Sequence, residues 1–415
     1  MLSSIRNEKG VALIMAVFAM VLVVFIATEV AYETQVEYVS SSQAVARVKA
    51  YYAAKSGVEL SLYRILIYKK AMAQFGEQLG ENKSLLDPIW QFPFSWPPIG
   101  LDDLNEVDKD QAKTIVKEST MDAQYMVTIE GEGGKIDIND LGSENKALSD
   151  GVRRQILQIF ENELENNKAF KEKYDNFDFD KLVNNIQDWV DEDKVSMNGG
   201  GDESSKYTQP DGAKNYTLPP NAAFKTVGEL HMVLDMEDEF YDLLKDKITV
   251  FGTKGINVNY APEPVLMALD PQIKDEALSW ITKRRSTPEL GGPFKDADDF
   301  YAFIETKGVR TENMRKAKLP LLFNSEYNFR IVSAGMYGNT RRELTVITYD
   351  VDSLTTPYVE MLDKLAEENK AGGTNPPPPP PPTNPPPVNP GTNPATKAKV
   401  KIPKGRPNIV FWRET

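Results

Sequence analysis

The hydrophobic residues of this chain form one unbroken run near its start and then a periodic stripe. Residues 11–28 contain no charged side chain, and this length is enough to cross a bilayer as a helix. No proline follows before residue 71, and Gly57 is the only glycine in 29–70. Small and apolar residues recur there at spacings of three and four: Ala44, Val48, Tyr51, Ala54, Val58, Leu62 and Ile65. The pattern predicts one helix of roughly 60 residues, about 90 Å long, half apolar anchor and half amphipathic spine.

The rest of the chain mixes strand-like and helix-like segments. Residues 123–130 alternate like a strand, and 135–139 are expected to be its hairpin partner across the Gly-rich turn 131–134. Helical patterns dominate from 146 to about 245 and are interrupted by the Gly-, Asp- and Ser-rich loop 196–217. Further strands are expected at 248–251 and 255–259, further helices at 263–269, 274–284 and 295–305, and a second hairpin at 327–335 and 341–351. This order predicts an α+β fold with a helical block set into sheet segments.

The C-terminal residues have a different composition. Residues 360–370 are polar and helix-prone, and 374–394 are dominated by proline, which predicts a polyproline II spacer of about 65 Å. A basic segment, 397–407, and the short apolar run 409–412 follow. We expect a tether outside the fold, which is either a disordered tail or a spacer with a short docking peptide at its end. A basic end that folds back on the acidic body is the alternative.

Charge and composition restrict the compartment and the chemistry. Arg6 and Lys9 precede the apolar run and Glu29, Glu33 and Glu37 follow it, so the body is expected on the non-cytoplasmic side. The chain has no cysteine, which excludes disulfides and thiol chemistry. The net charge of −13 argues against nucleic acid as a partner.

No catalytic constellation is recognisable. The single histidine, His231, lies on a predicted helix and is expected to be packed or at the surface. No serine has a Gly-x-Ser-x-Gly context, and no phosphate-cradling glycine loop precedes a helix. We therefore expect a protein that is not an enzyme. A signal-anchored periplasmic hydrolase is the rival hypothesis, and it lacks the nucleophile and base that it requires.

Acidic residues gather around the end of one predicted helix. The helix 178–190 places Leu182, Val183, Ile186 and Trp189 inward. Three acids, Asp188, Asp191 and Asp193, lie at its C-terminal end, and Asp202 and Glu203 follow in a Gly-rich loop that can fold back. Carboxylate oxygens suit Ca²⁺, although the EF-hand pattern is absent. By composition alone, a solvated acidic loop is the alternative.

The start of the chain resembles the leader of type IV pilins and pseudopilins. A short polar leader ending in Lys9-Gly10 precedes the apolar run at Val11. Prepilin peptidase cuts such leaders after the glycine, so the resemblance implies cleavage between Gly10 and Val11 and N-methylation of Val11. An ordinary signal anchor is the alternative.

Five further segments, in order, extend the likeness to the minor pseudopilin K family of type II secretion systems. They are 50–59 (Ala-Tyr-Tyr-Ala-Ala-Lys-Ser-Gly-Val-Glu), 135–139 (Lys-Ile-Asp-Ile-Asn), 188–193 (Asp-Trp-Val-Asp-Glu-Asp), 222–230 and 256–266 (Ile-Asn-Val-Asn-Tyr-Ala-Pro-Glu-Pro-Val-Leu). The resemblance runs from residue 1 to about 351 and excludes the proline-rich tail.

This resemblance implies a pseudopilin fold with a long transmembrane helix, an antiparallel sheet and a large inserted α-helical domain with two subdomains. The expected parts are a leader (1–10), a spine helix (11–70), loop and strands (71–142), the inserted domain (143–325), a closing hairpin (326–352) and the linker with its basic tail (353–415). The resemblance further implies a single-pass protein of the bacterial inner membrane with its bulk in the periplasm. Its place would be the pseudopilus tip, where it helps to initiate and cap assembly for export of folded proteins.

The same resemblance implies partners and a cofactor. The expected partners are other minor pseudopilins of the tip complex, prepilin peptidase, the inner-membrane assembly platform and the outer-membrane secretin. It also implies calcium in the α-domain, with Asp188, Asp191, Asp193, Asp202 and Glu203 as the candidate ligands.

One residue bears on the position in a filament. Major pilins carry a glutamate five residues after the cut, and here that position is Met15. That carboxylate would pair with the amine of the preceding subunit, and an unpaired carboxylate in an apolar core is costly. Met15 therefore favours a subunit with no predecessor.

A type IV pilus or competence-type minor pilin is the alternative function. Residues 224–236 resemble half of a helix-hairpin-helix DNA-binding unit. The hairpin reads Leu234-Asp235-Met236 without the required glycine, and acidic residues at 237–239 disfavour phosphate.

Overall fold

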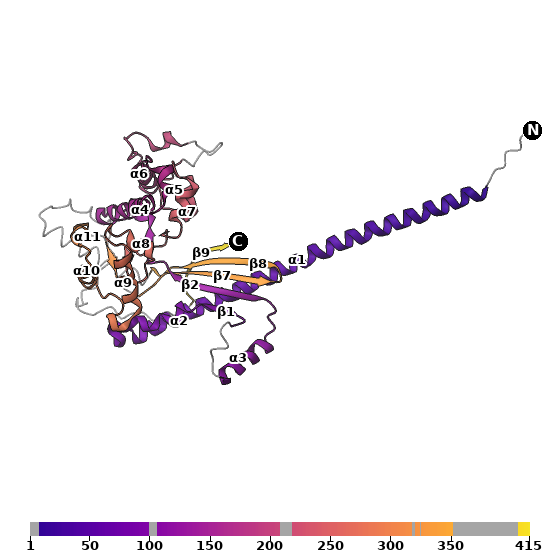
Figure 1. Ribbon diagram of the computed structural model, residues 1–415, viewed down its shortest axis with the longest axis horizontal. Helices are drawn as coiled ribbons and strands as arrows, with labels where there is room; N and C mark the ends of the chain where they lie inside the picture. The colour runs from indigo at the N-terminus through magenta and orange to yellow at the C-terminus, as the bar shows by residue number, and fades with distance from the viewer. Residues whose placement is uncertain (1–7, 99–105, 208–217, 318–319, 324, 352–405) are drawn as a thin grey trace, which may run out of the picture.

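A long helix leaves a folded body at one end of the molecule (Figure 1). The computed structural model describes residues 8–98, 106–207, 218–317, 320–323, 325–351 and 406–415. The leader up to residue 7, the helix-prone segment 360–370 and the proline-rich segment 374–394 lie outside the described residues.

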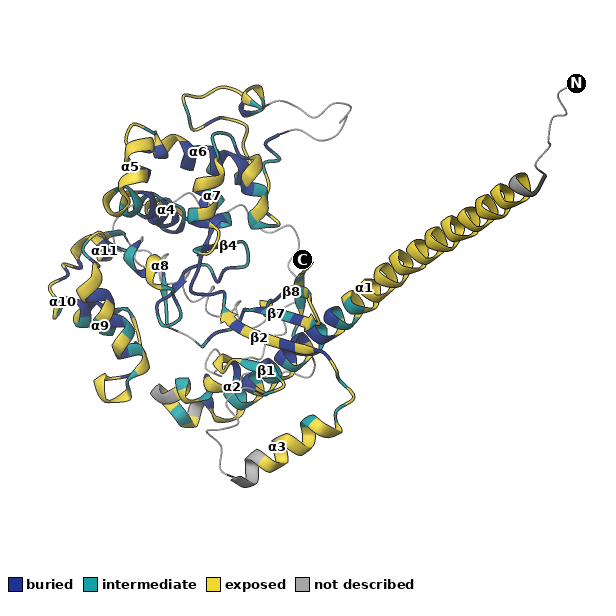
Figure 2. Ribbon diagram, turned by 45° about the vertical axis from the view of Figure 1, so that its right-hand side comes forward, coloured by how far each residue is buried: buried dark blue, intermediate teal, exposed yellow. Residues whose placement is uncertain are grey.

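The long helix, α1 (Glu8–Leu79), is 72 residues in length, or about 108 Å. Figure 2 shows its first half exposed on every side, and the sheet covers only its second half. Buried positions in that half begin at Ala50 and continue through Ala54, Val58, Leu62 and Ile65. The predicted stripe was therefore wrong at its start, because Ala44 and Val48 are exposed. Within the described part of the chain, α1 is the one helix long and apolar enough to span a membrane.

A five-stranded antiparallel sheet packs along the second half of α1. Its strands stand in the order β1-β2-β7-β8-β9. Their bounds are β1 Phe94–Trp96, β2 Gln124–Gly131, β7 Phe329–Tyr337, β8 Thr340–Thr348 and β9 Ile409–Glu414. The predicted strand at 123–130 and the predicted second hairpin are confirmed as β2 and as the β7–β8 pair. Alternate residues of β2 are buried and exposed, so one face of the sheet meets α1.

The predicted first hairpin is wrong. β3 (Ile136–Asp137) pairs in parallel with β4 (Ile248–Thr249), and β2 pairs instead with β1 and β7. The Gly-rich turn at 131–134 therefore leads the chain out of the sheet and into the helical block.

The helical block fills the space at the C-terminal end of α1 (Figure 1). It is inserted between β2 and β7, and one continuous apolar core runs through it. Its helices are η3 Ile138–Gly142, α4 Lys146–Asn166, α5 Lys168–Tyr174, α6 Phe179–Val190, η4 Glu203–Lys206, η5 Val227–Met232, α7 Asp238–Leu244, α8 Glu263–Met267, α9 Asp275–Ser286, η6 Pro288–Leu290, α10 Ala297–Glu305 and α11 Glu312–Ala317. A short parallel pair, β5 (Ile256–Asn257) with β6 (Leu321–Leu322), joins the middle of the block to its C-terminal end. Elsewhere, η1 (Gly80–Leu86) and α2 (Pro88–Gln91) follow α1, and α3 (Glu106–Glu118) lies on an excursion between β1 and β2.

Buried charges join the block to the sheet. Glu132, fully buried just after β2, accepts hydrogen bonds from Thr249 Oγ1 at 2.5 Å and Lys135 Nζ at 3.2 Å, and it pairs with Arg330 of β7. Burial opposes its ionisation, but Lys135 and Arg330 outweigh that effect and lower the pKa of Glu132. A buried, fully paired carboxylate of this kind fixes the block in one orientation relative to the sheet.

Helix and sheet approach most closely where neither carries a large side chain. A Cβ at Gly335 of β7 would lie 2.0 Å from the Ala50 carbonyl oxygen and 2.4 Å from the Ala54 nitrogen. A Cβ at Gly57 would lie 2.3 Å from Ser333 Oγ, which itself donates a hydrogen bond to the Ala54 carbonyl at 2.8 Å. The contact is therefore backbone against backbone at Gly335, whereas at Gly57 the helix backbone meets the side chain of Ser333.

The end of the chain belongs to the fold, which overturns the prediction of a tether free of it. β9 pairs with β8, and Tyr349 N donates to the Asn408 carbonyl at 3.0 Å. The Phe411 ring lies 6.2 Å from that of Phe251 in the block, and Arg406 pairs with Glu59 of α1 at 3.0 Å. Of the two possibilities that the sequence left open, the structure has the end folded back on the body.

Gly335→Ala should disrupt the contact between helix and sheet. The new methyl group meets rigid backbone, so α1 and β7 must separate, at a cost of about 1–3 kcal/mol or more. Thermal denaturation of the full chain in detergent measures the loss. Gly228→Ala is the matched control, because its new Cβ would come no closer than 3.8 Å to another group. Equal melting of the two variants would contradict the close approach.

Deleting residues 406–415 should lower the melting temperature, because β8 loses its partner strand and Phe251 and Glu59 lose their contacts. A body of this size loses about 2–4 °C for each kcal/mol removed. Deleting 374–394 alone, which leaves β9 on the chain, serves as the control and should change the melting temperature little. Unchanged melting of the shorter chain would restore the tether hypothesis.

Candidate metal centre

The acidic residues that the sequence singles out lie around the C-terminal end of α6, at the upper end of the block in Figure 1. Asp178 caps the start of this helix by accepting a hydrogen bond from Lys181 N at 2.9 Å. Leu182, Val183, Ile186 and Trp189 are all fully buried, as predicted. Packing of that face leaves no freedom for α6 to rotate, so its last turn holds Asp188 and Asp191 in fixed positions.

Three carboxylates converge beyond this helix end. Oxygen atoms of Asp188, Asp191 and Glu203 all lie within 4.8 Å of one another. The loop returns through an antiparallel bridge between Val195 and Asp202, which brings Glu203 back over the helix. Asp188 and Glu203 are buried, and Asp191 is half-buried.

Hydrogen bonds orient these carboxylates but leave some of their oxygen atoms without a partner. Asp188 accepts from Ser196 Oγ and from Met197 N, both at 2.9 Å. Glu203 Oε2 accepts from Asn221 Nδ2 at 2.9 Å. Two further oxygens, Asp191 Oδ1 and Glu203 Oε1, are buried and have no partner among the described residues. Such orphaned acceptors are rare in folded proteins and call for a bound cation or solvent.

The pKa shifts of these acids also favour a bound cation. Burial raises the pKa of Asp191 to about 7, and the carboxylates of Glu203, Asp193 and Asp188 add to the rise. Burial likewise raises the pKa of Glu203, against the hydrogen bond from Asn221. The helix C-terminus adds its own partial negative charge. A cation placed among these oxygens removes all of these penalties at once.

Two of the five predicted ligands stand outside this group. Asp193 is exposed, and its Oδ1 accepts from Val195 N at 2.7 Å. Asp202 is also exposed and caps η4 through Ser204 N at 2.9 Å. Both side chains therefore accept local hydrogen bonds within their own loops. Sequence reasoning missed Asn221, which orients Glu203 from a segment 18 residues further on; no local pattern marks it.

The donor set fits a hard divalent cation. It consists of carboxylate oxygens from two segments, and backbone or solvent oxygens would complete the six to eight ligands that Ca²⁺ takes. Neither cysteine nor histidine contributes, which disfavours zinc.

Comparison with known proteins places this site in a family. Two sequence models, both described as type II secretion system (T2SS), protein K, match residues 134–253 and 256–320. The first covers the segment that holds all three converging carboxylates. Over these residues the chain is similar to type II secretion system protein K.

One relative and one solved structure illustrate the likeness. The type II secretion system protein K of Pseudomonas aeruginosa is 24% identical over 341 residues, which are 82% of this chain and 88% of that protein. A crystal structure of the GspK-GspI-GspJ complex from the type 2 secretion system of enterotoxigenic Escherichia coli matches with a TM-score of 0.42 and 16% identity. That match covers 56% of this chain and 76% of the other.

These likenesses support a minor pseudopilin of the type II secretion system. The predicted α+β architecture, with its long N-terminal helix, antiparallel sheet and inserted helices, is confirmed. The length and apolar character of α1 fit a single-pass anchor. The competence-type alternative gains no support from the family.

Proposed function

We propose that this chain is the non-enzymatic subunit at the tip of the pseudopilus, where it starts and caps assembly from the periplasmic side of the inner membrane. The observation that supports assembly best is the surface of α1 beyond the apolar run. Val36, Val45, Val48 and Tyr52 each expose about half or more of their surface, although they lie past the predicted membrane span. Exposed apolar side chains at helical spacing require neighbouring helices to cover them.

The place of the helical block supports the tip position. The block lies at the end of α1 farthest from the N-terminus (Figure 1). Subunits that stack through parallel α1 helices would bring the next subunit into the space that the block fills. A subunit of this shape has room only at the top, which agrees with Met15 in place of the filament glutamate.

We further propose that Asp188, Asp191 and Glu203 hold a structural Ca²⁺. The ion would neutralise three carboxylates that otherwise repel one another and would pin the loop after α6 to the helix end. Asp193 and Asp202 are not needed as side-chain ligands in this proposal.

Processing by prepilin peptidase is the first test. Intact-mass measurement of the membrane-extracted chain should show loss of residues 1–10 and one added methyl group on Val11. Gly10→Val should block the cut, whereas Asn7→Ala, in the same leader, should be processed normally. Recovery of a wild-type chain that still carries its leader would contradict the processing proposal.

Assembly with other minor pseudopilins is the second test. The full chain, co-expressed with those encoded beside it, should co-purify with them from detergent extracts. Val48→Asp should reduce the recovered partners at least tenfold, because it buries a charge between helices. Ser42→Asp changes an exposed polar position on the same helix and should reduce the recovery of partners much less. A chain that ignores these partners but binds duplex DNA at physiological salt would favour the competence-type alternative.

Calcium binding is the third test. Ca²⁺ should stabilise the wild-type chain by about 2.7 kcal/mol when its free concentration is 100-fold above Kd, and a chelator should reverse the effect. Asp191→Asn should abolish the calcium-dependent rise in melting temperature. Without calcium it should melt at or above the wild type, since it relieves repulsion among the acids.

Asp193→Asn is the matched control for this test. It removes the same charge two residues away, and the retained oxygen can still accept from Val195 N. It should keep the calcium response. Identical melting of the wild-type chain with calcium and with chelator would rule the site out.

A further inference from the structure

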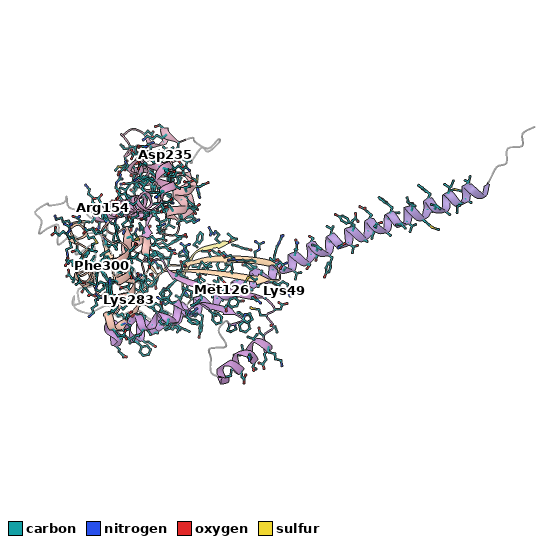
Figure 3. The ribbon with its side chains drawn as sticks, in the orientation of Figure 1. Lys49, Met126, Arg154, Asp235, Lys283 and Phe300 are labelled. Carbon is teal, nitrogen blue, oxygen red and sulfur yellow. The ribbon has the colours of Figure 1, made fainter. Side chains whose placement is uncertain are left out.

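A second cavity lies within the helical block, away from the acidic group. It has a volume of about 270 Å³ and opens between α4 and the chain that follows α8. α4 contributes Gly151, Gln155 and Gln158, and the far wall includes Leu269, Tyr301 and Met314. Arg154, on the same helix and at the rim, is labelled in Figure 3. The two walls come from distant parts of the chain, residues 151–161 and 268–321.

The floor of the cavity carries an unsatisfied amide. Gln155 is only 1% exposed, and neither its Oε1 nor its Nε2 has a partner among the described residues. Two polar neighbours on the same helix are already used: Gln158 Nε2 donates to Asn162 Oδ1 at 3.0 Å, and Arg154 Nη2 donates to the Ala317 carbonyl at 3.3 Å. An orphaned donor and acceptor in one buried side chain is a strong exception to the rule that buried polar groups are paired.

The chemistry of this amide selects a class of ligand. A carboxamide offers an acceptor and a donor side by side. In an extended polypeptide the N–H and C=O of one residue point to the same side, as they do in an antiparallel ladder, so the two can pair at once. Leu157, Leu269, Met314 and Leu321 supply apolar surface beside Gln155. We propose that this cavity binds an extended segment of another polypeptide, with main-chain groups on Gln155 and an apolar side chain against this surface.

The proposal goes beyond the proposed function and depends neither on calcium nor on the tip position. An amide that stays unpaired in the core costs free energy, and a ligand that pairs with it would remove that cost. Replacing an unpaired buried amide by an apolar group of the same shape is neutral or stabilising, whereas replacing a paired one is destabilising. The same substitution therefore separates a ligand-binding role from a structural one.

The test uses the full chain in detergent, labelled with ¹³C at its methionine methyl groups. The probe is N-acetyl-L-leucine N′-methylamide, one apolar side chain between two amides. Met314 is buried in the cavity wall and reports on binding, and Met314→Leu assigns its signal. The probe should shift that signal in a saturable way. The corresponding aspartate derivative should not, because its charge would enter an apolar cavity.

Two variants complete the experiment. Gln155→Leu should weaken probe binding at least tenfold while leaving the melting temperature unchanged or higher. Gln124→Leu, on the exposed side of β2, should bind the probe within twofold of the wild type. The proposal is overturned if the probe leaves Met314 unshifted in the wild type, if Gln155→Leu binds it equally well, or if Gln155→Leu lowers the melting temperature. The last result would mean that the amide has a structural partner.

Discussion

The close contact between α1 and β7 is the constraint on which the rest of the structure depends. At Gly335 the strand backbone meets the helix backbone at Ala50 and Ala54 with no space for a methyl group between them. This contact fixes the angle and height of the sheet on the helix. Since the helical block leaves the sheet after β2 and returns at β7, its position at the end of α1 follows from the same contact. The acidic site and the Gln155 cavity are therefore held at a set distance from the anchor.

Local patterns in the sequence predicted the elements well and their partners poorly. Periodicity identified α1, β2, the β7–β8 hairpin and the buried face of α6, because each depends on residues within a few turns of one another. It predicted that 135–139 forms a hairpin with β2. The segment instead pairs with β4, more than 100 residues later in the chain. It also began the buried stripe of α1 at Ala44. An apolar stripe is the same whether the chain's own sheet or another subunit covers it, so periodicity could not mark where the sheet begins.

The acidic site shows the same division. The sequence indicated which residue types could hold a cation and that the loop could return to the helix. It could not distinguish acids that face the helix end from acids that cap their own loop, because Asp193 and Asp202 bond to backbone N–H groups two residues ahead. The burial that leaves Glu203 Oε1 without a partner among the described residues arises only once the loop has returned through the bridge between Val195 and Asp202. The sequence did not indicate Gln155 for the same reason, because its burial without a partner arises only in the folded core.

The docking of β9 has a kinetic consequence. Tyr349 and Asn408 are hydrogen-bonded neighbours, yet 58 residues, 350–407, separate them along the chain. Loop-closure entropy rises with loop length, and contacts between distant residues form late in folding. The four other strands and α1 can assemble without this segment, so the edge of β8 stays open until the last residues arrive. During folding that open edge, with its row of unpaired backbone groups, is the part of the sheet most exposed to wrong pairing.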